Sequence, residues 1–110
     1  MYKLGTIILT PFPFTDLAGT KVRPALIVSK TNPGEQDVIV CFITSKSERN
    51  QYAVKIDNTT ETGLKVPSTV RLDKIATIEK KVVLGELGKV QNSFFKENSH
   101  TFFDILGFEF

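Results

Sequence analysis

The 110-residue chain has few of the side chains that hydrolytic and metal-dependent mechanisms commonly use. It contains one cysteine, Cys41, and one histidine, His100, so an internal disulfide, a catalytic histidine pair and a histidine-bound metal site are excluded by count. It also lacks tryptophan and any glycine-rich phosphate-binding motif. An enzyme of this composition must work with arginine, threonine, serine, lysine and backbone donors, and we expect neither a metal nor another cofactor.

The few reactive groups that are present have ordinary structural interpretations. Cys41 lies in the apolar run 38–43, which favours a small buried side chain over a nucleophile. His100 is flanked by Ser99 and Thr101, as is typical of a surface histidine on a helix. The carboxylates are scattered over turns and strand ends, which gives no support to two-metal chemistry.

No apolar run approaches the length needed to cross a membrane, and the N-terminus has no signal-peptide pattern. With 41% apolar and 24% charged residues, the chain is in the ordinary globular range, and we expect one cytoplasmic domain over residues 1–110. The net charge of +2 allows a partner that is RNA or an acidic peptide without requiring one.

The hydrophobic pattern predicts several short strands followed by one helix. Strand-like runs are separated by turns rich in proline, glycine and asparagine, and helical spacing begins at Asn92 or Ser93 and ends at Gly107. This order predicts a small, mainly β barrel with a C-terminal helix packed on it. The expected strands cover residues 6–10, 22–29, 37–44, 52–56, 68–72 and 76–78, with a further short strand between residues 80 and 90.

One arginine stands at the start of a strand that is otherwise apolar. Arg23 precedes Pro24, and a residue before proline is restricted to extended conformations. Proline has no N–H for a sheet ladder, so Pro24 belongs at the beginning of a strand or on an edge strand. Arg23 is therefore either a stiffly held binding residue beside the loop that precedes it or an ordinary solvated arginine.

Several segments together resemble the MazF/PemK family of toxins, in the right order over nearly the whole chain. The Arg-Pro strand start is the most specific of them. The matching segments are residues 5–9, 12–16, 22–29, 43–45 and 68–78, and the Pro-Phe-Pro-Phe-Thr-Asp run at 11–16 resembles the PemK-like branch. The resemblance implies an SH3-like barrel with a C-terminal helix, usually homodimeric. It also implies metal-independent, sequence-specific cleavage of single-stranded RNA (an mRNA interferase), inhibited by an antitoxin.

The resemblance places the catalytic arginine of the family on Arg23 and its catalytic threonine on Thr44. Arginine suits this role because its forked donors match a phosphate and its charge is permanent. Thr44 ends an apolar strand, where its hydroxyl can donate to the same phosphate or orient a ribose 2′-hydroxyl, although threonine is also simply a good strand residue. We expect further RNA contacts from residues in the two flanking loops: Phe14, Thr15, Asp16, Lys21, Ser45, Lys46 and Arg49.

The chain departs from the family pattern at three places. Many members have Gly-Asp where this chain has Gly5-Thr6, and Phe-Asp-Pro where it has residues 12–14. Many also have a longer loop ahead of the arginine than residues 16–21 provide. Because this loop helps to form the RNA groove of the family, the departures affect the expected cleavage specificity most.

Two other functions stay open on the sequence. A gyrase poison of the CcdB kind has a similar barrel, but that class acts through a terminal Trp-Gly-Ile and this chain ends in Gly107-Phe108-Glu109-Phe110. A catalytically silent barrel that binds RNA or a peptide would retain RNA binding without cleavage. For partners we expect single-stranded RNA, an antitoxin and a second copy of the chain, since a barrel this small leaves apolar surface that pairing would cover.

Overall fold

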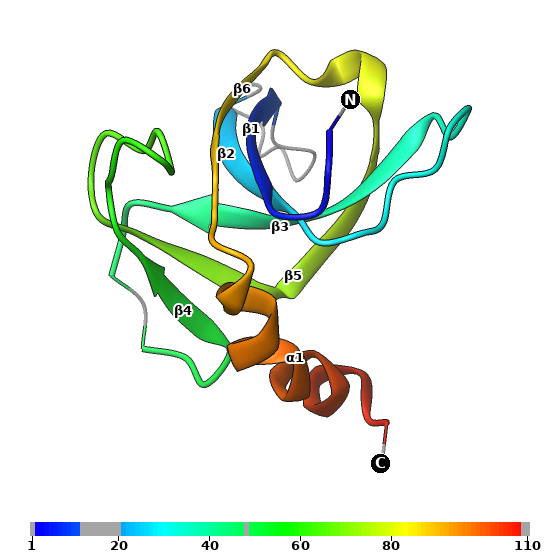
Figure 1. Cartoon of the computed structure of the whole chain (residues 1–110). Coiled ribbons are helices and arrows are strands. Elements are labelled where there is room, and N and C mark those ends of the chain that lie inside the picture. Colours follow the sequence, from blue (N-terminus) through cyan, green and yellow to red (C-terminus); the bar gives the residue numbers. More distant parts are fainter. Residues whose placement is uncertain (1, 12–20, 48, 109–110) are drawn as a thin grey trace.

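The computed structural model describes residues 2–11, 21–47 and 49–108. Within these ranges the chain forms six strands, one short 3-10 helix and one α-helix (Figure 1). The elements are β1 (Thr6–Pro11), β2 (Val22–Ile27), β3 (Asp37–Thr44), β4 (Ala53–Ile56), β5 (Ser68–Glu79), η1 (Lys80–Val82), β6 (Gly85–Lys89) and α1 (Ser93–Leu106).

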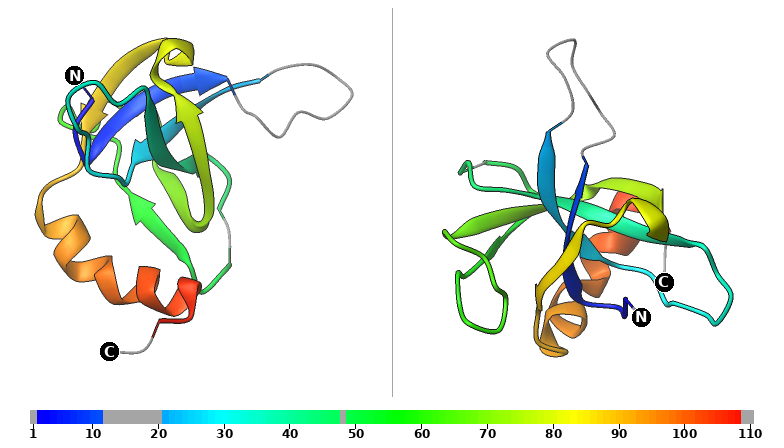
Figure 2. Two further views of the ribbon diagram at one scale, coloured as in Figure 1. Left: turned by 90° about the vertical axis from the view of Figure 1, so that its right-hand side faces the viewer. Right: turned by 90° about the horizontal axis from the view of Figure 1, so that it is seen from above.

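All six strands belong to one antiparallel sheet with the order β4-β5-β3-β2-β1-β6. The sheet curls strongly, and α1 lies along one side of it (Figure 2). The predicted mainly β barrel with a C-terminal helix is confirmed. No helix in the described ranges is long and apolar enough to cross a membrane.

The sequence prediction was wrong in one strand. Residues 68–72 and 76–78 were expected as two separate strands, but they form the single strand β5. The pairing of β5 with β3 shifts register between Cys41 and Ile43, and the segment of β5 around Asp73 and Lys74 accommodates that shift. A bulge of this kind keeps charged residues inside a continuous strand.

The sheet buries apolar side chains on both faces, in two clusters. The first cluster lies beneath α1, which covers it with Phe94, Phe95, Phe102 and Ile105. The second lies on the opposite face of β1, β2 and β3. The buried members of the first cluster are Ile7, Leu26, Cys41, Ile43, Ile56, Leu64, Val70 and Leu72, and those of the second are Ile8, Ala25, Ile27, Val38, Val40, Phe42 and Ile78.

The segment after β4 joins the two edges of the sheet. The backbone N–H of Lys89 in β6 donates to the carbonyl of Glu61 over 2.8 Å. A side chain at Gly88 would stand 2.2 Å from the same carbonyl oxygen, and one at Gly63 would stand 1.9 Å from the carbonyl oxygen of Leu87. Only glycine permits backbones to approach this closely, so these two glycines allow the barrel to close.

Helix α1 has the predicted position and a different N-terminal detail. Asn92 occupies the N-cap position, but its side chain caps no backbone N–H. Gly107 ends the helix with φ = 76°, in the left-handed conformation that favours glycine. Phe95, Phe102 and Leu106 share one side of α1 and line an apolar groove of about 450 Å³.

Candidate active site

Arg23 is the second residue of β2, and at this position β2 is paired with β1 but not with β3. On one side Arg23 pairs with Thr10 of β1. On the other side, the pairing of β2 with β3 begins only after Pro24, at Ala25–Phe42. Because Pro24 has no N–H to donate, it cannot extend that ladder toward Arg23. Pro24 itself is the third residue of β2, paired with Leu9 of β1, so it lies at the beginning of the ladder to β3 and not at the beginning of the strand.

Thr44 is the last residue of β3 and lies on the same face of the sheet as Arg23. Side chains alternate between the faces of a strand, so Arg23 shares a face with Ala25, and Thr44 shares one with Phe42. Ala25 and Phe42 are paired residues of the second cluster. Arg23 and Thr44 therefore follow the last β2–β3 pair on the face opposite α1, and both side chains are half-buried. The two residues therefore occupy the ends of adjacent strands.

The Thr44 hydroxyl is held from one side by the backbone. The N–H of Lys46 donates to Thr44 Oγ1 over 3.2 Å. Such a contact from the residue two positions later fixes the side chain against the turn that follows the strand. A threonine hydroxyl has one proton and two acceptor lone pairs, so this bond occupies one lone pair and leaves the proton for a ligand.

Two further threonines extend this polar line across the sheet. Thr10 pairs with Arg23, and Thr69 of β5 pairs with Thr44. Both are buried, with exposed fractions of 0% for Thr10 and 7% for Thr69. The order across β1, β2, β3 and β5 is therefore Thr10, Arg23, Thr44, Thr69. Sequence reasoning missed the outer two, because only the register brings them beside the inner two.

The structure places some of the other predicted contacts at this edge of the sheet. Lys21 immediately precedes β2, while Ser45 and Lys46 immediately follow β3, and all three are exposed. Arg49 is exposed farther along the connection to β4. The predicted contacts Phe14, Thr15 and Asp16 lie outside the described residues.

A second arginine on this face was not singled out from the sequence. Arg71 and Asp73 form a two-pronged ion pair, with Nε–Oδ1 at 2.8 Å and Nη2–Oδ2 at 2.7 Å. They lie two and four residues after Thr69 in β5, on the face opposite Leu72 and the first cluster. The hydrogen bond from Arg71 lowers the pKa of Asp73, so this carboxylate is charged at neutral pH. The Arg-Leu-Asp alternation in an otherwise apolar strand was the only sequence signal that could have pointed to this ion pair.

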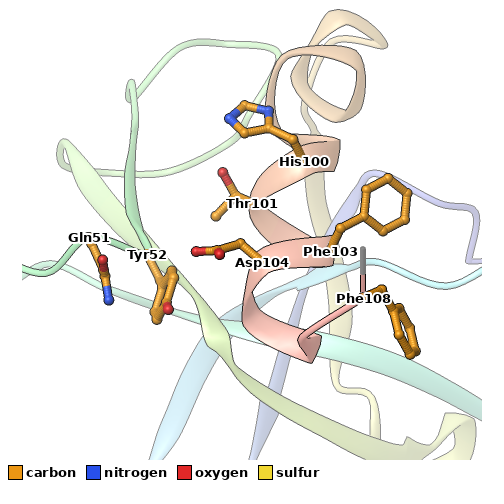
Figure 3. Close-up of a pocket in the computed structure, with 7 residues that line it drawn as sticks. All are labelled: Gln51, Tyr52, His100, Thr101, Phe103, Asp104 and Phe108. Carbon is orange, nitrogen blue, oxygen red and sulfur yellow. The ribbon is translucent and has the colours of Figure 1, made fainter. Parts of the chain in front are cut away.

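Cys41 and His100 have the environments expected from the sequence. Cys41 is fully buried, and burial, followed by the charge of Asp73, raises the pKa of its thiol to about 12. His100 is exposed on α1 and lines a pocket of about 470 Å³ beside Tyr52, toward which Asp104 points (Figure 3). Neither Arg23 nor Thr44 is among the residues that line this pocket. Among the described residues, no three His, Cys, Asp or Glu side chains gather as metal ligands would.

Comparison with known proteins identifies the family. The model of the PemK-like, MazF-like toxins of type II toxin–antitoxin systems matches residues 3–102. The chain belongs to this family. No curated protein sequence matches it significantly.

Solved structures similar to this MazF-like chain share its fold at low identity. An endoribonuclease from a mycobacterial species, in complex with its antitoxin, is 19% identical with a TM-score of 0.79, over 100% of this chain and 99% of that one. The Mycobacterium tuberculosis toxin MazF-mt6 is 21% identical with a TM-score of 0.78, and the match covers 96% of this chain and 99% of that one. A MazE–MazF structure from Deinococcus radiodurans is 22% identical to this chain with a TM-score of 0.75, and the match covers 98% of each chain. At such identities the structures establish the shared fold.

Proposed function

We propose that this chain is a toxin that cleaves single-stranded RNA at short specific sequences without a metal ion. The observation that carries the proposal is the placement of Arg23 and Thr44 on one face, beyond the last β2–β3 pair and opposite α1. Membership of a toxin family and the description of two structural relatives as endoribonucleases support it.

The proposed reaction is an attack of a ribose 2′-oxygen on the adjacent phosphorus. The new bond forms a 2′,3′-cyclic phosphate while the bond to the 5′-oxygen breaks, and that oxygen takes up a proton as the 2′-hydroxyl loses one. Extra negative charge develops on the phosphoryl oxygens. Arg23 offers two parallel donors to that charge, and the Thr44 proton offers a third. The permanent charge of Arg23 makes it a poor free base, so its main role is charge stabilisation.

The neighbouring residues have supporting roles in this proposal. Lys21, Ser45, Lys46 and Arg49 follow the phosphate backbone on either side of the cleaved bond. Arg71, held by Asp73, adds a second cation on the same face. The predicted contacts of Phe14, Thr15 and Asp16 with bases or with the loop itself stay predictions.

The same surface would receive the antitoxin. Relatives of this fold are described as complexes of toxin and antitoxin. An extended or partly helical acidic segment lying across the cations around Arg23 would exclude RNA by occupying its place. We place this competition in the cytoplasm, where mRNA is found.

A second copy of the chain is the proposed occupant of the apolar groove beside α1. Its lining includes several apolar residues that are unusually exposed: Leu4 at 49%, Ile39 at 39%, Phe103 at 39% and Leu106 at 54%. These residues come from the N-terminal segment, β3 and the C-terminal half of α1, so they form one continuous surface. Apolar surface of this kind is normally covered by a partner. The C-terminal phenylalanines suit an interface in part: Phe103 and Phe108 are exposed, Phe94 and Phe95 pack on the core, and Phe110 lies outside the described residues.

The test is to incubate the purified protein with a long single-stranded RNA in excess EDTA. We expect discrete fragments from the wild type and a loss of cleavage of at least about 10²-fold in Arg23→Ala and in Thr44→Val. Lys96→Ala, which removes an exposed cation on α1, is the matched control and should cleave normally.

Each contrary result points to a different error. Cleavage only after Mg²⁺ is added would refute the metal-free mechanism. Undiminished cleavage by folded Arg23→Ala would refute the assignment of the site. RNA that is bound but never cut would indicate the silent barrel, and RNA that is neither bound nor cut would make gyrase binding the next measurement.

A further inference from the structure

Thr69 is a buried residue whose hydroxyl has no structural explanation within the protein. Its exposed fraction is 7%, and valine has nearly the same shape and an equally good strand preference. Within the described ranges, the Thr69 side chain makes no hydrogen bond, although the neighbouring Ser68 hydroxyl does, to the carbonyl of Val66 at 2.9 Å. The Thr69 hydroxyl is therefore available for a partner in the functional state.

The Thr69 oxygen is also within reach of a ligand. In the described part of the chain, no fully buried side-chain oxygen or nitrogen lacks a hydrogen-bond partner. The unbonded Thr69 oxygen must therefore keep some contact with the surface. Two residues are paired with Thr69 in the sheet: Thr44 of β3 on one side and the exposed Lys55 of β4 on the other. Paired residues in antiparallel strands have Cβ atoms about 4.5–5.5 Å apart, which allows two threonine hydroxyls to meet.

We propose that Thr69 is a positioning residue that acts through Thr44. Thr44 Oγ1 already accepts the N–H of Lys46, and it has one lone pair left. When substrate binds, the Thr69 hydroxyl donates to that lone pair. Thr44 then accepts two hydrogen bonds, and its own proton has no role except donation to the phosphate. Catalytic hydrogen bonds that are open in the free protein commonly close only in the substrate complex.

This inference rests on the proposed RNA cleavage and makes a separate prediction. Thr69→Val keeps the shape and removes the hydroxyl, whereas Thr69→Ser keeps the hydroxyl and loses a methyl group. In single-turnover cleavage, Thr69→Val should lower the rate constant about 10-fold relative to the wild type. The protein concentration that gives half of the maximal rate should stay within about 2-fold of the wild-type value. Thr69→Ser should stay close to wild type. Thr77→Val, an exposed threonine in the same strand, is the matched control and should change nothing.

A double-mutant cycle distinguishes positioning from a general structural effect. If Thr69 acts only through Thr44, then Thr69→Val should cost nothing further in a Thr44→Val background. Urea unfolding should show Thr69→Val to be as stable as the wild type or more so. If Thr69→Val fails to fold, the comparison of Thr69→Ser with Thr69→Ala carries the same test.

The contrary outcomes are distinct. Full activity in folded Thr69→Val, with active wild type, would overturn the inference and leave the proposed function standing. The same loss in the wild-type and Thr44→Val backgrounds would also overturn it, since Thr69 would then act independently of Thr44. Inactive wild-type protein would refute the proposed function, and with it the basis of the inference.

Discussion

The close contact between Gly88 of β6 and the segment after β4 predicts how a single methyl group would destabilise the barrel. In Gly88→Ala, the new Cβ would stand 2.2 Å from the carbonyl oxygen of Glu61 and 2.5 Å from the carbonyl carbon and oxygen of Thr62. Ordinary contacts of this kind are 3.4–4 Å long. The atoms in the way belong to backbone, so the segment itself must move by about 1 Å or more.

The expected cost follows from two contributions. Inserting a methyl group into a tight contact costs about 1–3 kcal/mol. The displacement would also break the hydrogen bond from the Lys89 N–H to the Glu61 carbonyl, which is worth about 1 kcal/mol. Gly88→Ala should therefore lose about 2–4 kcal/mol, which corresponds to a fall in Tm of about 10–20 °C for a domain of this size.

The same strand contains the matched control. A Cβ at Gly85 would meet nothing within 4 Å, and Gly85 has no positive φ. Gly85→Ala should be neutral or stabilise by up to about 1 kcal/mol, because alanine restricts the unfolded chain. Thermal and urea unfolding of both variants measure the difference in stability between them. Both substitutions restrict the unfolded chain in the same way, so that effect cancels in the comparison. Equal Tm values for Gly88→Ala and Gly85→Ala would refute the claim that this contact closes the barrel.

Two further predictions concern the assembly and the Arg71–Asp73 pair. If a second copy covers the apolar groove, Leu106→Glu should sediment as a monomer at micromolar concentration. Leu84→Glu changes an exposed leucine outside the groove and should stay dimeric. A monomeric wild type would contradict this prediction. Arg71 lowers the pKa of Asp73 below its ordinary value of 3.8, so the unfolded chain binds a proton at Asp73 more readily than the folded chain does. The ion pair therefore stabilises the fold at pH values above 3.8, and this contribution disappears as the pH falls through the lowered pKa. Asp73→Asn should therefore lose up to about 1 kcal/mol at neutral pH and show less of a further decrease toward acid pH, and an unchanged acid-unfolding profile would contradict this.

Much of the fold follows from local signals. Asp37–Thr44 was predicted with its observed bounds because its apolar run is continuous and turn residues flank it. The helix end at Gly107 followed from the need for a left-handed residue there. The continuity of β5 could not be predicted, because Asp73 and Lys74 interrupt its apolar pattern and only the shifted pairing with β3 keeps them in the strand.

The candidate site divides in the same way. Arg23 and Thr44 could be chosen from the sequence because each stands at the end of an apolar strand in a recognisable motif. Thr10 and Thr69 carry no such signal, since threonine is common in strands, and Arg71 carries only the weak one of an Arg-Leu-Asp alternation. Their relation to Arg23 and Thr44 depends on which strands are neighbours and on which residues are opposite one another.

The sequence by itself determined most of the succession of strands, the terminal helix and the burial of Cys41. These properties depend on composition and on spacing along a few residues. Tertiary structure decided that the threonines and arginines of four strands share the face opposite α1, and that two glycines allow the sheet edges to meet. Register and strand order arise from the burial of both apolar clusters at once, which no single segment specifies.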